Sequence, residues 1–278
     1  MKLSAVLSRV YTKGEVFSLM RVLNGLSFLI YYTLVLVPNF DRFFSTSGFV
    51  HPEEFTFFPG SWLFRIWPHD TVKFVLFVLT VLLFVCYTVG FYARLAQALL
   101  IPLQLAFHNA NPLVNHEPQQ LNNLLLVVLL FAPIDEHFSL KKIPWSSVFG
   151  KASPGQQTWI LRLMQIYFGT YYFFAGLKKL PDHNWIEGVA VGKLAAWDFL
   201  GRHNLVNEFC QIPFVSAALS WFTLAYEMSF LMVSFTPARI FLIPLGLAFH
   251  LGITLTFDIG MFFWSMLMWY PLVLRRED

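Results

Sequence analysis

Apolar segments of membrane-spanning length follow one another along nearly the whole chain, and this feature limits the fold most. Of the 278 residues, 57% are hydrophobic and only 13% are charged, about half the charged fraction of a typical soluble domain. Water could not hydrate such a surface, so lipid is the expected solvent. The sequence therefore predicts an all-α integral membrane protein.

The apolar segments predict a bundle of about eight transmembrane helices. They cover residues 18–38, 72–92, 95–107, 118–132, 158–177, 213–235, 240–257 and 259–274. The third and fourth fall short of the roughly 20 residues that a spanning helix needs, so they form one buried hairpin or two tilted spans. No repeat, low-complexity tract or linker interrupts the pattern, so we interpret residues 1–278 as a single domain.

Basic residues predict the orientation in the membrane. Lysines and arginines are more frequent on the side of the N-terminus, which places both termini in the cytoplasm. The long connectors at residues 39–71 and 181–212 then face outward, together with most histidines. Their Trp, Phe and Pro content predicts interfacial helices on the outer side, and we expect the active side to face outward.

Several partner and cofactor classes are not indicated by the sequence. No block rich in lysine and arginine suggests nucleic acid binding. Cys86 and Cys210 form no CxxC pair, and His108 with His116 is weak evidence for metal, so we predict no metal site. Membrane lipid is the expected partner, and the oligomeric state is left open.

Two adjacent lysines at the end of an apolar segment form the first candidate site. Lys178 and Lys179 follow Tyr171-Tyr172-Phe173-Phe174-Ala175-Gly176-Leu177 and precede Trp185 in Asn184-Trp185-Ile186-Glu187-Gly188. Adjacent helical residues point about 100° apart, so one amine can reach the interface while the other faces the bundle. Burial disfavours a charged amine, which would suit a base. Alternatively, both lysines only anchor a helix end.

A polar stretch between two apolar segments forms the second candidate. Residues 108–117 include Asn111, Asn115 and His116, whose amides and imidazole suit a polar ligand. The alternative is a capped turn, because Asn and Pro favour turns.

Carboxylate and imidazole groups inside later spans form the third candidate. Glu227 lies in an apolar segment and needs a partner, and His250 of the next segment could relay protons with it. The alternative is a structural polar pair between helices. Within the first span, we expect Arg21 to neutralise a carboxylate or to reach the interface.

Together these stretches resemble the vitamin K-dependent gamma-carboxylase family, whose membrane part defines the HTTM (horizontally transferred transmembrane) domain. The resemblance rests on the Tyr-Phe-Phe-Ala-Gly-Leu-Lys-Lys-Leu stretch with Trp185-Ile186-Glu187-Gly188, on Asp135-Glu136-His137-Phe138-Ser139-Leu140, and on Phe249-His250-Leu251-Gly252-Ile253 after Glu227. It covers most of the chain. No counterpart of the large lumenal domain of the animal enzyme is evident.

The resemblance implies a reaction. Family carboxylases oxidise reduced vitamin K with oxygen, starting from a lysine base, and carboxylate a peptide glutamate at its gamma carbon. The matching base is Lys179, with His250 and Glu227 as further catalytic candidates. The binding candidates are Lys178, Asn111, Asn115, His116 and Trp185. The implied cofactor is reduced vitamin K or another membrane quinol, and the implied partner is a secreted peptide or protein.

Two other functions remain open at this stage. One is a membrane factor for the maturation of a secreted peptide or toxin, without carboxylation, as in some HTTM-only relatives. The other is a quinone- or lipid-binding membrane protein without catalysis, which the aromatic content also fits.

Overall fold

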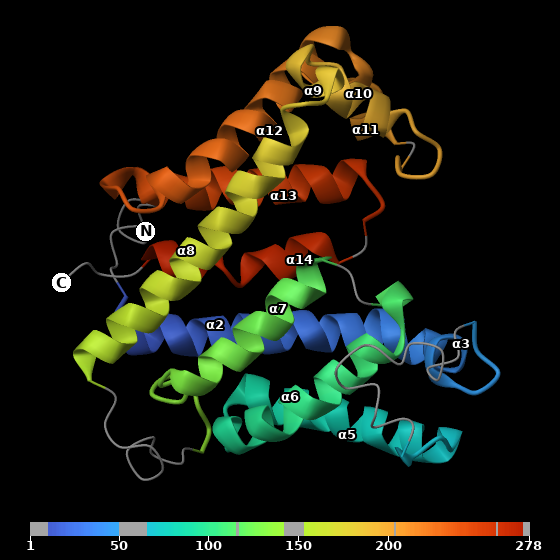
Figure 1. Ribbon diagram of the computed structural model, residues 1–278, viewed down its shortest axis with the longest axis vertical. Helices are drawn as coiled ribbons and strands as arrows, with labels where there is room; N and C mark the ends of the chain where they lie inside the picture. The colour runs from blue at the N-terminus through green and yellow to red at the C-terminus, as the bar shows by residue number, and fades with distance from the viewer. Residues whose placement is uncertain are drawn as a thin grey trace. The chain divides into compact units, whose positions relative to one another are not determined.

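The computed structural model describes residues 11–49, 66–114, 117–141, 153–202, 204–259 and 261–274. Helices dominate these ranges (Figure 1), and isolated β-bridges join Phe91 to Lys141 and Gly201 to Phe257. The chain divides into two compact units, one at residues 11–160 and the other from Leu161 onward. Each unit is described by itself below.

The first unit contains four main helices and several short turns of helix. Its elements are α2 (Lys13–Tyr31), η1 (Tyr32–Leu36), η2 (Val37–Asn39), α3 (Phe40–Phe44), α5 (Asp70–Val89), α6 (Ala93–Ala110), η4 (Pro112–Val114), α7 (Glu117–Val128) and η5 (Leu129–Phe131). A capping box between Thr12 and Glu15 begins α2. Aromatic rings join α2, α5 and α6: the Phe28 and Phe84 centroids lie 4.8 Å apart, and those of Phe77 and Phe107 lie 5.5 Å apart.

A glycine ends α5 and lets a second segment approach closely. Gly90 has a φ of 74°, in the left-handed region that glycine adopts without a steric penalty. A Cβ at this position would lie 2.5 Å from the Cα of Ser139. The close approach allows the Leu140 amide to donate to the Val89 carbonyl and the Lys141 amide to the Gly90 carbonyl. The loop after η5 is thereby fixed to the end of α5.

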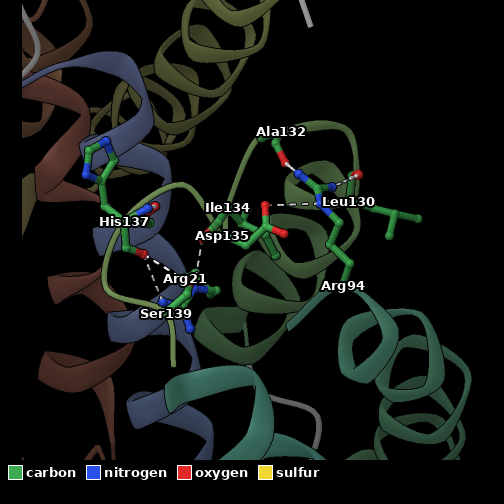
Figure 2. Close-up of polar contacts among 9 residues, drawn as sticks. Arg21, Arg94, Leu130, Ala132, Ile134, Asp135, His137 and Ser139 are labelled. Atoms are coloured by element: carbon green, nitrogen blue, oxygen red, sulfur yellow. Dashed lines mark hydrogen bonds and ion pairs between the residues drawn. The ribbon is translucent and has the colours of Figure 1, made fainter. Parts of the chain in front are cut away.

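Arg21 joins α2 to this loop and to the end of α5 (Figure 2). Its side chain is fully buried and donates only to backbone oxygens. The acceptors are the carbonyls of Tyr87, Thr88, Ile134, His137 and Phe138. The bonds to Thr88, Ile134 and Phe138 measure 2.8, 2.9 and 2.6 Å. Arg21 does not reach the interface, and although it is attracted by the Asp135 carboxylate, its hydrogen bonds go to carbonyls that the last turn of α5 leaves without donors.

A second buried arginine holds the same loop from α6. The Nε of Arg94 lies 3.3 Å from Oδ1 of Asp135, and its Nη2 donates to the Ala132 carbonyl at 2.7 Å (Figure 2). Arg94 and Asp135 are both buried. The charges therefore compensate each other inside the unit, as buried ions require.

The second unit packs two long helices against each other around short connecting helices. Its elements are α8 (Pro154–Lys179, most of which lies here), α9 (His183–Ile186), α10 (Ala190–Ala195), α11 (Leu205–Gln211), α12 (Pro213–Val233), η7 (Pro237–Phe241), α13 (Leu242–Thr256), α14 (Phe262–Leu267) and η8 (Tyr270–Leu274). Gly169 and Gly176 face α12, where added Cβ atoms would lie 2.5 Å from Leu231 and 3.0 Å from Met228. Such small residues let membrane helices approach closely.

All eight predicted segments overlap helices, and the helical membrane architecture is confirmed. Four helices within the described residues are long and apolar enough to cross a membrane, at Lys13–Phe44, Asp70–Val89, Pro213–Val233 and Pro237–Thr256. Shorter apolar helices occupy Gln119–Phe131 and Phe262–Leu274. The count of eight spans, the interfacial placement of the connectors and the single-domain interpretation stay predictions.

Replacement of Arg21 tests the role of its carbonyl contacts. Arg21→Met should lower the free energy of unfolding by about 3 kcal/mol or more, because buried carbonyl groups lose their donors. The exposed Arg42, whose Nη1 contacts Asn39 at 3.3 Å, provides the matched control Arg42→Met. Thermal unfolding of the purified protein in detergent measures both, and equal melting temperatures would contradict this role.

Candidate functional site

Lys179 and Glu227 form a close ion pair between α8 and α12. The Lys179 Nζ donates to both carboxylate oxygens of Glu227, at 2.7 and 2.9 Å, and to the Ala175 carbonyl at 3.2 Å. Glu227 is 8% exposed at its side chain and Lys179 is 23% exposed. The carboxylate that the sequence left in an apolar segment therefore has a cationic partner, and the amine is still reachable.

The two adjacent lysines have different environments, as their helical spacing predicts. Lys178 is exposed, whereas Lys179 faces Glu227. The ring of Trp185 covers Lys179, with Nζ 5.3 Å from the ring centroid, a distance typical of a cation–π contact. Trp185 is placed by α9, which begins after α8 where Asp182 accepts from the Asn184 amide. Lys179 is thus bounded by a carboxylate on α12 and an aromatic face on α9.

His250 contacts a tyrosine, and the predicted pairing with Glu227 was wrong. Its Nε2 is hydrogen-bonded to the hydroxyl of Tyr172, and both side chains are buried. Glu227 pairs with Lys179 instead, because opposite charges attract more strongly than a carboxylate attracts a neutral imidazole in a medium of low dielectric constant. The Nδ1 of His250 has no hydrogen-bond partner in the part of the chain that the structure describes.

Three tyrosines near the site were not singled out from the sequence. The Tyr172 ring stacks on Phe230 with centroids 4.3 Å apart, and the hydroxyls of Tyr226 and Tyr270 lie 3.2 Å apart. Tyr172 precedes Lys179 by seven residues, so helical periodicity alone could have placed both on one face of α8. Tyr226 and Tyr270 carried no comparable signal, because their pairing depends on the packing of η8 against α12.

The polar stretch before α7 is described only in part. Asn111 is fully buried, its Nδ2 donates to the Phe43 carbonyl at 3.0 Å, and its Oδ1 accepts from the Leu113 amide at 2.8 Å. Its amide therefore holds a turn, which agrees with the capped-turn alternative. Asn115 and His116 lie outside the described residues. Asn111 belongs to the first unit, and its predicted role in substrate or quinol binding stays a prediction.

Metal-ligating groups and thiols add little to the site. Within the described ranges, no group of three or more His, Cys, Asp and Glu residues could hold a metal ion. Cys86 and Cys210 are free thiols, and Cys210 is buried in α11 beside Thr256 at 3.8 Å. The polar chemistry in the second unit therefore centres on Lys179, Glu227 and His250.

Comparisons with known proteins identified one family. The profile of the HTTM domain matches residues 13–277, nearly the full chain. Searches of curated proteins and of solved structures found no match. The match spans the residues of all three candidate sites.

The Tyr226–Tyr270 contact depends on a glycine in α13. A Cβ at Gly246 would collide with both hydroxyls, whereas a Cβ at Gly252 on the same helix would meet nothing within 4 Å. Gly246→Ala should therefore destabilise the protein by about 1–3 kcal/mol. Gly252→Ala is the matched control and should leave stability unchanged or raise it slightly, because alanine favours helix. Thermal unfolding in detergent compares them, and equal stability of the two variants would contradict the tight contact.

Proposed function

The chain belongs to the HTTM domain family, and from this premise we propose that it is a membrane enzyme of the vitamin K-dependent gamma-carboxylase type. The observation that carries the proposal is the position of the Lys179 amine between the Glu227 carboxylate and the Trp185 ring. An ionisable pair inside a helical bundle is expensive to maintain and suggests function. The HTTM domain is associated with the membrane domain of vitamin K-dependent carboxylases.

The pair can act as a base by taking up one proton. With Lys179 as ammonium and Glu227 as carboxylate, the pair has no net charge. If the proton of the ammonium moves to the carboxylate, a neutral amine is exposed toward the accessible side of Lys179. That amine can remove a proton from a bound hydroxyl group, which leaves an ammonium beside a carboxylic acid. The step adds one proton and one positive charge to the pair, and Glu227 acts by accepting the first proton.

The surrounding residues fit a reduced quinol. A quinol is a flat aromatic ring with two hydroxyls, and the second unit offers aromatic faces together with a buried imidazole nitrogen, Nδ1 of His250, that has no partner in the described chain. Trp185, His250 and Phe262 are the residues that would hold the ring, and Lys179 would take the hydroxyl proton. When bound, the quinol supplies, with oxygen, the driving force for removing a proton from the gamma carbon of a peptide glutamate.

The remaining parts of the proposal concern binding and location. Lys178, Asn111, Asn115 and His116 are proposed to contribute to substrate or quinol binding. The acceptor is proposed to be a glutamate of a secreted peptide or protein, and lipid surrounds the chain. The active side is proposed to face outward from a bacterial inner membrane, with both termini in the cytoplasm.

A non-catalytic quinone- or lipid-binding role is the second candidate, and one observation favours it. Lys179 has three oxygen acceptors within 3.2 Å, which is also the arrangement of a purely structural ion pair. The two roles differ in what the loss of the amine would do. A structural lysine affects stability, whereas a base affects turnover even when the fold is preserved.

Replacement of Lys179 separates the two roles. Wild type, Lys179→Met and the neighbouring control Lys178→Met should be reconstituted in nanodiscs with vitamin K hydroquinone, oxygen and labelled bicarbonate. Quinone epoxide formation and label uptake by glutamate peptides are then read separately. Lys179→Met should lose turnover at least about 100-fold, because a general base contributes that much or more. Lys178→Met should keep its turnover at saturating substrate and at most weaken binding, because this exposed lysine is proposed to contribute to binding and not to proton removal.

Two results would contradict the proposal. One is a Lys179→Met protein that is folded and as active as the control. The other is folded wild-type protein that forms no epoxide, which would favour the peptide-maturation or binding alternatives.

A further inference from the structure

The most exposed apolar side chains of the described residues are concentrated in one short stretch. Phe199, Phe214 and Leu205 are 83%, 82% and 81% exposed, more than any other large apolar side chain in the described ranges. All three lie within residues 196–202 and 204–214, which we call the ledge. Trp197, Phe209 and Ile212 are also exposed in this stretch. A water-facing loop would not retain such a surface, so the ledge requires a partner.

The ledge is a fixed scaffold rather than a free loop. The Nδ2 of Asn207 donates to the carbonyls of Ala195 and Thr256, both at 2.9 Å. The Asp258 amide donates to the Leu200 carbonyl at 2.8 Å, next to the bridge between Gly201 and Phe257. These bonds attach the ledge to the end of α13 and hold its apolar side chains outward.

The ledge lies at the ends of two helices that can cross a membrane. One candidate span begins at Pro213, immediately beside Phe214, and another ends at Thr256, which accepts a hydrogen bond from Asn207. Figure 1 shows α10 and α11 beside the end of α12 where that helix begins. Within α10 and α11 there are only six and seven residues, too few to span a bilayer. The ledge is thus placed at a membrane surface.

The apolar surface of the ledge continues a stripe on α12. Exposed residues recur at helical spacing along this candidate span, at Phe214, Ala218, Trp221, Ala225, Ser229 and Met232, and all except Ser229 are apolar. In a membrane helix this stripe faces lipid, and Phe214 belongs to both the stripe and the ledge. On α11, the apolar residues Leu205 and Phe209 form one side, which Ile212 extends just after the helix, whereas Glu208 and Gln211 form the neighbouring polar side. This division is typical of an element that lies in a bilayer interface.

We propose that the ledge forms a membrane-interface anchor whose partner is the phospholipid leaflet at which α12 begins. Its aromatic and leucine side chains lie at the boundary between headgroups and acyl chains, where aromatic residues are favoured. Glu208 and Gln211 face the aqueous side. The continuity with the exposed stripe of α12 selects lipid over a second copy of the chain. The inference does not depend on the proposed carboxylase activity.

Depth-dependent quenching tests the anchor. In a Cys86→Ser background that keeps the buried Cys210, single cysteines at Phe199, Leu205 and Phe214 carry an environment-sensitive NBD label. Gln211→Cys is the matched control on the polar side of α11. The full-length protein is placed in phosphatidylcholine–phosphatidylglycerol nanodiscs with a nitroxide at a shallow acyl carbon, and iodide serves as the aqueous quencher. The labelled positions are strongly exposed, so the labels should leave the fold intact, and the melting temperature checks this.

The three labels should emit at shorter wavelength than the control, and their ratio of lipid to iodide quenching should be at least about threefold higher. Water-like emission with strong iodide quenching at all three positions would overturn the anchor. Blue-shifted emission that neither quencher affects would also overturn it, since the surface would then be covered by a second copy of the protein.

Discussion

The ammonium group of Lys179 lies against both oxygens of the Glu227 carboxylate, at 2.7 and 2.9 Å, and under the ring of Trp185. Two charges can remain inside an apolar bundle only if they compensate each other closely, since removal from water costs several kcal/mol per ion. The contact requires α8 and α12 to approach closely, which Gly169 and Gly176 permit. It also requires α9 to turn back so that Trp185 reaches the amine. The packing of α8 against α12 and the position of α9 in the second unit are therefore linked to this pair. The candidate chemistry depends on it as well.

The first unit satisfies the same constraint with different partners. Arg21 donates its hydrogen bonds to backbone carbonyls at the end of α5 and in the loop after η5, and Asp135 supplies an attractive negative charge nearby. Arg94 uses Asp135 together with carbonyls of the same loop. Both arginines therefore fix a segment that has no regular structure of its own. The fork of a guanidinium group suits this task, because its several donors can serve acceptors on different elements.

The sequence predicted the elements better than the contacts between them. Apolar segments located helices at every predicted span, because burial in lipid leaves a composition signal that needs no partner. Helical periodicity also separated Lys179 from Lys178. The carbonyl acceptors of Arg21 were not predicted, because free carbonyls at a helix end are a property of backbone geometry and leave no trace in side-chain composition. The pairing of His250 with Tyr172 was missed for a similar reason, since it depends on how α8 and α13 face each other in space.

We propose that the Lys179 amine acts as a base in addition to neutralising the Glu227 carboxylate. Exchange of the two charges, in the double variant Lys179→Glu with Glu227→Lys, tests it most directly, with each single variant as a reference. We expect the exchange to restore much of the melting temperature lost in the single variants, because it rebuilds an ion pair. Epoxide formation from vitamin K hydroquinone should stay absent, because the amine has moved to α12. Recovery of epoxide formation together with stability would contradict the role of Lys179 as a base and would show that the pair is a structural contact.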